Sequence, residues 1–226
     1  MRRVLRTLSS VLIVAGLLLV ADAVLTVVWQ EPSSAVYAHI EQGKLEDRLD
    51  RLETVRLPPV DRRALAGLKS QKRKVAFAAR ALDRRTDDGE PVGRIRVPRI
   101  GISTVVVAGT DADDLRKGPG HYPDTPLPGA RGTVAVAGHR TTYGAPFRKV
   151  DKLRRGDPIV ITMPYGRFTY AVERTRIVPP TATWVTNRVS YDRLVLSACH
   201  PLYSAAQRIV VFARLVRTEP RSAALA

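Results

Sequence analysis

The chain has 226 residues, 45% of them hydrophobic and 26% charged, so it can build a core and is not disordered as a whole. This length allows one domain of ordinary size with appendages, or two small domains. The formal net charge of +16 predicts an anionic neighbour (nucleic acid, anionic lipid or wall polymer), or else only a soluble, arginine-rich surface. The single cysteine, Cys199, excludes an intramolecular disulfide and a thiolate-rich zinc site.

The N-terminal segment is predicted to anchor the chain in a membrane. A basic tip, residues 1–6, precedes an apolar run over residues 8–29, which is as long as the roughly 20 residues that a helix needs to cross a bilayer. Basic residues stay on the cytoplasmic side, so we expect residues 1–30 to form a cytoplasmic tip and a single span in the cell membrane. The domain beyond it then faces outside, and no nucleic-acid partner is expected. Ala21-Asp22-Ala23 resembles a signal-peptide cleavage site, which is the alternative, but the apolar run continues past it.

Residues 31–90 are predicted to form a charged helical stalk and linker. Apolar residues recur at helical spacing among charges of both signs over residues 45–52 and 60–82, with Pro58-Pro59 between the two stretches. A plain spacer is the favoured interpretation, and a partner-binding helical hairpin is the alternative. Thr86-Asp87-Asp88-Gly89-Glu90 is typical of a linker.

From residue 91 the pattern changes to short β-type runs separated by Gly and Pro. The expected strands cover residues 93–97, 102–107, 133–137, 158–162, 167–172, 193–197 and 209–215. Seven or eight strands predict an all-β barrel or sandwich over residues 91–218, followed by a disordered tail at 219–226. The cluster Asp111 to Asp114 is expected to start a helix rather than to bind calcium, and no metal or cofactor is predicted.

Cys199 is the candidate nucleophile. A thiol attacks a carbonyl only as the thiolate, so it needs an imidazole nearby and a donor for the developing oxyanion. Of the four histidines, His139 is the best placed, because Gly138-His139-Arg140 ends an apolar strand, as Cys199 does. His200 is adjacent to Cys199 and would point to the opposite face of the strand. Arg208 opens the last strand and could stabilise the oxyanion, or could simply be a surface charge.

These motifs resemble those of the sortases. The resemblance is carried by Val136-Ala137-Gly138-His139-Arg140, by Leu196-Ser197-Ala198-Cys199 and by Arg208 after it, and it covers roughly residues 91–217. Residues 118–123 and 138–147 look most like those of class E sortases of high-GC Gram-positive bacteria. The anchor, the helical region and the C-terminal β domain are also similar to that family.

The resemblance implies a closed eight-stranded β-barrel with short helices and a thiol transpeptidase activity. In such an enzyme Cys199 attacks the Thr carbonyl of a C-terminal sorting signal of the LPxTG or LAxTG type on a secreted protein. The resulting thioester is resolved by an amine of a peptidoglycan precursor. His139 is implied as the acid/base group and Arg208 as the oxyanion and substrate-positioning group. Wall anchoring is expected rather than pilus polymerisation.

The sequence departs from the family in the run before the cysteine. The usual Thr-Leu-x-Thr-Cys is replaced by Val195-Leu196-Ser197-Ala198-Cys199, so both threonines are absent. Candidate substrate-binding residues are Ala198, Ser197, His121 and Tyr122, although His121 is better interpreted as shaping its loop.

Two other functions are weighed against this one. An L,D-type transpeptidase would place Gly before the cysteine and Arg close after it, whereas Ala198 precedes Cys199 and Arg208 comes nine residues later. A catalytically weakened or inactive membrane-tethered module that binds anionic wall polymer would suit the missing threonines.

Overall fold

The computed structural model describes residues 2–28, 32–54 and 58–221. Within them the helices are α1 (Arg2–Val28), α2 (Pro32–Thr54), α3 (Pro59–Ala66), α4 (Gln71–Asp83) and α5 (Ala112–Lys117). The strands are β1 (Pro91–Val97), β2 (Ile102–Ala108), β3 (Gly120–His121), β4 (Thr133–Ala137), β5 (Pro158–Met163), β6 (Gly166–Val178), β7 (Arg193–His200) and β8 (Gln207–Pro220). Three short 3-10 helices complete it: η1 (Pro98–Ile100), η2 (Val150–Lys152) and η3 (Thr183–Thr186).

The strands close into a barrel, which confirms the predicted fold class. Their order around the barrel is β1-β2-β3-β4-β7-β8-β6-β5. The β2–β3 and β4–β7 pairs are parallel and the other pairs are antiparallel. Valine and isoleucine dominate the runs, because β-branched side chains pack well on a pleated surface. Their alternate residues fill the interior, where Ile95, Phe168 and Leu196 are fully buried.

All seven expected strands are present, and several are longer than the sequence pattern suggested. The eighth strand, β3, has only two residues and was not predicted. The expected tail at 219–226 is corrected at its start, because β8 continues to Pro220, which pairs with Gly166. The extra residues of β8 are held by hydrogen bonds to β6, which is distant in sequence, so no local pattern predicted them. The helix expected at Asp111 is also confirmed, since Asp111 and Asp114 form a capping box at the start of α5.

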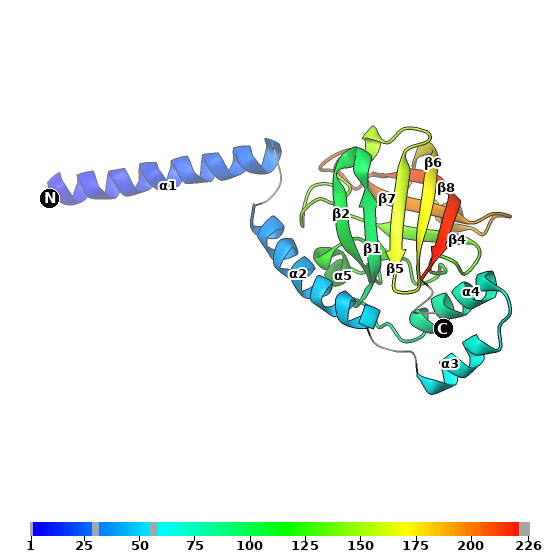
Figure 1. Ribbon diagram of the computed structural model, residues 1–226. Helices are drawn as coiled ribbons and strands as arrows, with labels where there is room; N and C mark the ends of the chain where they lie inside the picture. The colour runs from blue at the N-terminus through cyan, green and yellow to red at the C-terminus, as the bar shows by residue number, and fades with distance from the viewer. Residues whose placement is uncertain (1, 29–31, 55–57, 222–226) are drawn as a thin grey trace.

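The first helix projects away from the barrel (Figure 1). Its segment Arg2–Val24 is long and apolar enough to cross a membrane, and none of it is buried against the rest of the chain. Trp29, the last residue of the predicted apolar run, lies outside the described residues. Only residues 29–31 separate this helix from α2.

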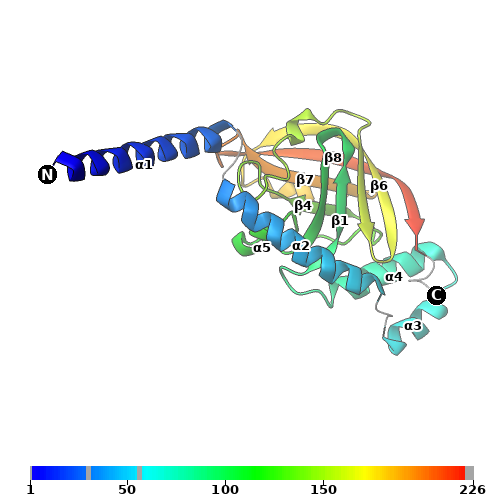
Figure 2. The same ribbon diagram turned by 60° about the vertical axis from the view of Figure 1, so that its left-hand side comes forward.

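The helices of the predicted stalk contact the barrel. Helix α2 runs along one side of it (Figure 2), where Leu45 and Leu49 are buried against Val105 and Val107 of β2. Helices α3 and α4 add Leu65, Val75, Ala78 and Ala79 to the main core. The division of the chain at residue 90 stays a prediction, but these helices bury apolar faces that a solvated spacer would leave exposed.

Candidate active site

The site lies where three neighbouring strands end. Strands β4, β7 and β8 are adjacent in the barrel, and Ala137 of β4 pairs with Ser197 of β7. Two residues further along β7, Cys199 pairs directly with Arg208 of β8. Side chains that face each other across an antiparallel pair have their Cβ atoms about 4.5–5.5 Å apart. The structure therefore brings the predicted nucleophile and the predicted oxyanion group side by side.

Both side chains belong to the outer face of the barrel. Leu196 and Ala198 pack in the interior core, whereas Val195 packs in a second cluster, outside the barrel wall, with Phe212 of β8. Because successive side chains of a strand alternate, Cys199 follows Val195 and Arg208 follows Phe212 to that outer face. Cys199 is a free thiol and is half-buried.

His139 reaches the same place from β4. The amide of Gly138 donates to the carbonyl of Ser197 at 3.0 Å, which continues the β4–β7 pairing past the last residue of β4. The next residue, His139, therefore falls beside Cys199. Gly138 is needed here, because a Cβ at this position would lie 2.5 Å from the ring of Phe147. The close approach of Phe147 explains a glycine directly before the histidine.

The surroundings of His139 favour a neutral imidazole. Burial lowers the pKa of His139 below its usual value of 6.5, and the positive charge of Arg116 lowers it further. A neutral imidazole beside a thiol can accept its proton, which is the role of a general base. His139 also contacts Tyr143, with ring centroids 5.3 Å apart.

Arg208 is held by hydrogen bonds to the residues just before it in the chain. Its Nη1 donates to the carbonyl oxygens of Ala205 (2.9 Å) and Gln207 (3.0 Å). These bonds fix the guanidinium at the rim of the β7–β8 connection. A guanidinium keeps its positive charge in a protein, so Arg208 can stabilise an oxyanion but cannot act as a base.

Arg140 is a site residue for which no role was predicted from the sequence. It is 4% exposed, and its Nη1 contacts the carbonyl oxygen of Cys199 and Nδ1 of His200, each at 3.3 Å. Its Nη2 donates to the carbonyl of Arg148 (3.2 Å) and to Asp151 (3.0 Å). This guanidinium joins the end of β7 to the segment after His139. The only signal in the sequence was its place next to the histidine, since burial of a charge cannot be read from an arginine-rich chain.

The other predicted residues are divided between the two faces. Ala198 faces the interior, as does His121, which pairs with Val136 and is 3% exposed. The His121 ring contacts Thr125 and the carbonyl of Pro126, so it shapes its own loop. Tyr122 instead packs against the outer cluster. Ser197 lies two residues before Cys199 on β7, so its side chain points to the same outer face. Tyr122 and Ser197 therefore share the face of Cys199, and Ala198 and His121 do not.

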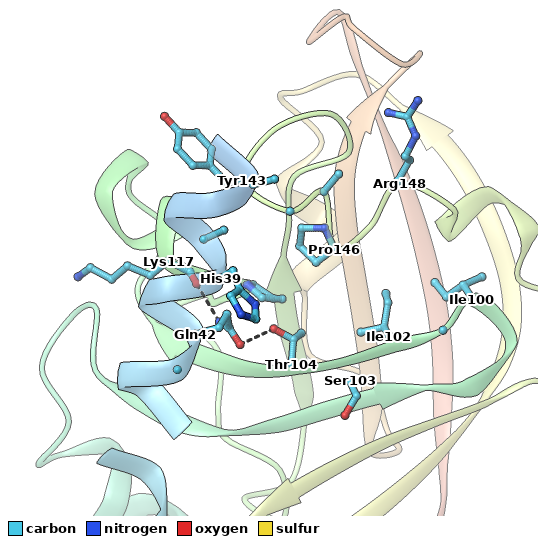
Figure 3. A pocket seen from close by; sticks show the side chains of 18 of the residues that line it. His39, Gln42, Ile100, Ile102, Ser103, Thr104, Lys117, Tyr143, Pro146 and Arg148 are labelled. Atoms are coloured by element: carbon cyan, nitrogen blue, oxygen red, sulfur yellow. Dashed lines mark hydrogen bonds between the residues drawn. The ribbon is translucent and has the colours of Figure 1, made fainter. Parts of the chain in front are cut away.

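A pocket of about 630 Å³ lies next to this site, between α2 and the segment that follows His139 (Figure 3). One wall comes from α2 with His39 and Gln42, and the other comes from Tyr143 and Pro146. Ile100 and Ile102 line the pocket where η1 leads into β2. Helix α2 and the segment after the histidine thus face each other across this pocket.

The arrangement combines a thiol, a mainly neutral imidazole and a permanent cation on one face of a closed β-barrel. No group of three or more His, Cys, Asp or Glu side chains that could hold a metal ion lies within residues 2–28, 32–54 and 58–221. These groups suit acyl transfer through a thioester, in which a base activates the nucleophile and a cation stabilises the oxyanion.

Comparisons with known proteins agree with this class. Residues 95–216 match the sortase domain family model, and the chain belongs to the sortase family. Sortase D of Bacillus subtilis is 34% identical over 134 residues, which cover 58% of this chain and 66% of that protein. Sortase SrtE1 of Streptomyces coelicolor is 27% identical over 152 residues, which cover 60% of this chain and 43% of that protein. The chain therefore matches less than two thirds of the length of these relatives.

Solved structures show the same fold. Sortase E of Streptomyces avermitilis superposes with a TM-score of 0.55 at 36% identity, over 61% of this chain and 95% of that one. A sortase D5 of Clostridium perfringens superposes with a TM-score of 0.62 at 24% identity, over 78% of this chain and 99% of that one. The second match extends over more than the barrel alone. The match to the sortase family disfavours the L,D-type alternative.

Proposed function

We propose that this protein is a class E-like sortase that cleaves a C-terminal sorting signal of the LPxTG or LAxTG type and joins the secreted protein to an amine of a peptidoglycan precursor. The observation that carries the proposal is the pairing of Cys199 with Arg208, with His139 at the neighbouring strand end. The likeness to sortase E of Streptomyces avermitilis supports the class. The likeness to sortase D of Bacillus subtilis makes class D the nearest alternative.

The first half of the reaction makes a thioester. His139 takes the proton of the Cys199 thiol, and the thiolate attacks the Thr carbonyl of the signal. Arg208 stabilises the oxyanion of the tetrahedral intermediate. The intermediate collapses with cleavage of the Thr–Gly bond, and the imidazolium returns its proton to the departing amine.

The second half transfers the acyl group. The amine of the wall precursor attacks the thioester, and His139 takes the proton that this amine loses. Collapse of the second intermediate forms a new amide and releases the Cys199 thiolate, which regains the proton. Tyr122, which is partly exposed and packs against the outer cluster, offers a surface for the signal on the same face.

We also propose that α1 anchors the protein with its N-terminus in the cytoplasm and the barrel outside. The basic tip before the apolar run supports this orientation. Residues 91–218 are then the extracytoplasmic catalytic domain, on the side where secreted substrates and wall precursors are found.

The test is cleavage of fluorogenic peptides carrying LPxTG and LAxTG by the full-length protein in detergent micelles. Cys199→Ala is expected to lower turnover at least about a thousandfold, because no other residue supplies the nucleophile. Arg208→Lys keeps the charge but changes the donor geometry, and should retain more activity than Arg208→Ala. Undiminished cleavage by Cys199→Ala would overturn the proposal. Absence of cleavage by every protein, with tight binding of anionic wall polymer, would favour the tethered binding module.

A further inference from the structure

The ring of Tyr143 contacts the proposed catalytic imidazole of His139 and has no role in the reaction described above. Tyr143 lies four residues after His139, and the two ring planes are tilted by 39° with centroids 5.3 Å apart. The guanidinium of Arg116 lies 5.9 Å from the centre of the same tyrosine ring. Tyr143 is therefore placed to limit rotation of the imidazole.

The backbone around Tyr143 is in a conformation that needs support. Tyr143, Gly144 and Ala145 have φ values of 49°, 72° and 42°, so three consecutive residues are left-handed. Two of them are not glycine, and side chains with a Cβ rarely adopt this region. The amide of Phe147 donates to the carbonyl of His139 at 2.9 Å and closes the segment from within. Strain of this kind persists only where the surroundings fix it.

Helix α2 supplies support from outside. The amide of Tyr143 donates to Oγ of Ser34 at 3.0 Å, and Ser34 is only 7% exposed. The ring of Tyr37 meets that of Tyr143 edge-on, with centroids 6.2 Å apart. A Cβ at Gly144 would lie in ordinary contact with Ala38, which shows how closely the helix follows the segment.

The helix is itself fixed to the barrel. The Gln42 amide pairs with the backbone of Val105 as a neighbouring strand would: Oε1 accepts from its N–H (2.8 Å) and Nε2 donates to its carbonyl (3.2 Å). The same Nε2 also donates to the carbonyl of Lys117 at 2.8 Å. Figure 3 shows Gln42 reaching from α2 to Thr104, with Tyr143 above it beside the same helix.

We propose that Tyr143 is a positioning residue for His139, and that α2, the helix that follows the membrane anchor, holds it in place through Ser34 and Tyr37. This rests on the proposed function of His139. The contacts run from α2 to Tyr143 and from Tyr143 to the imidazole. Through these contacts α2 helps to position the catalytic imidazole. Loss of the tyrosine ring leaves the imidazole free to turn away from Cys199 and exposes it to water.

The decisive variant is Tyr143→Asn in the full-length protein, because asparagine tolerates a left-handed backbone and removes only the ring. We expect kcat for sorting-peptide cleavage to fall about 10- to 100-fold with KM within about threefold, since a misplaced base slows the chemical step. Tyr143→Phe keeps the ring and should retain activity within about twofold. Ser34→Ala should lower kcat about threefold, whereas Val36→Ala, exposed on the same helix, should not change it.

A second measurement is independent of turnover. His139 faces the positive charge of Arg116 and the ring of Tyr143, and burial is the main cause of its lowered pKa. In Tyr143→Asn, NMR titration of the imidazole should give a pKa nearer to the ordinary value of 6.5, with Tyr143→Phe like the parent. Unchanged kcat and an unchanged titration in Tyr143→Asn would overturn the inference. If the parent fails to cleave any peptide but the titration moves as expected, the proposed function fails and the positioning role stands.

Discussion

At the residue scale, a buried arginine next to the proposed catalytic histidine joins the end of β7 to the segment that follows the histidine. Arg140 contacts the carbonyl of Cys199, the ring of His200, the carbonyl of Arg148 and the carboxylate of Asp151. Its Nε has no hydrogen-bond partner among the described residues, so the side chain carries a cost of burial that its other bonds must offset.

Arg140→Ala is expected to lower the free energy of unfolding by about 2–4 kcal/mol, because it leaves two carbonyls without their donor and removes the buried cation that pairs with Asp151. Urea unfolding of the full-length protein measures this. Lys152→Ala is the matched control, since Lys152 is the other cation near Asp151 but is largely exposed, and its loss should cost less than about 0.5 kcal/mol. Equal effects of the two substitutions would contradict a structural role for Arg140.

His121 should make the fold sensitive to acid. Burial lowers the pKa of His121 to about 4, against 6.5 for a free histidine. Between these values the unfolded chain binds more protons than the folded one, so stability falls as the pH drops from 6.5 to 4. The shift corresponds to about 3 kcal/mol. Unfolding at pH 7.5 and pH 4.5 should show a larger loss for the parent than for His121→Gln, and equal losses would show that His121 is not the cause.

At the scale of elements, α2 is attached to the barrel by more than apolar contact. Leu45 and Leu49 bury its inner face, and Arg94 of β1 binds Glu46 and Asp50 from the helix. These exposed ion pairs contribute little on their own. The amide of Gln42, which occupies the hydrogen-bonding groups of Val105, gives the helix its register on β2.

Gln42→Leu keeps the size of the side chain and removes the amide. We expect the free energy of unfolding to fall by about 1–3 kcal/mol, because the backbone groups of Val105 lose their partners. Hydrogen exchange should show faster exchange of the Val105 amide in particular. Lys44→Ala, which removes only a surface ion pair with Glu41, should leave that amide protected. Unchanged protection in Gln42→Leu would mean that α2 is not held as described.

At the scale of the whole molecule, anchor, helix and site follow one another closely. Helix α1 ends at Val28 and α2 begins at Pro32. Three residues span about 10 Å at most. With α1 in a membrane, the barrel is therefore held near its surface, because α2 is docked on the barrel and is not a free stalk. Such a position suits the proposed transfer to a wall precursor.

Much of the fold was predictable because its signals are local. The apolar run of α1, the alternation in β4 and β7, and the capping pair Asp111 and Asp114 each lie within a few consecutive residues. Strand β3 was missed, since two residues carry no periodicity and pair only because β2 and β4 lie on either side of them. The burial of α2 and α4 was missed because dense charges on their outer faces hid narrow apolar stripes.

For the site, the sequence by itself predicted Cys199, His139 and Arg208 as the reactive residues, because each stands at the edge of a predicted strand and all three carry the family resemblance. Only the tertiary structure decided how they meet. The pairing of β4 with β7, and of β7 with β8, sets Cys199 between His139 and Arg208. It also decided which residues support the site, since Arg140 contacts Cys199 and Ser34 contacts Tyr143, and each of these pairs is distant in sequence. Contacts of that kind depend on chain folding and leave no pattern along the chain.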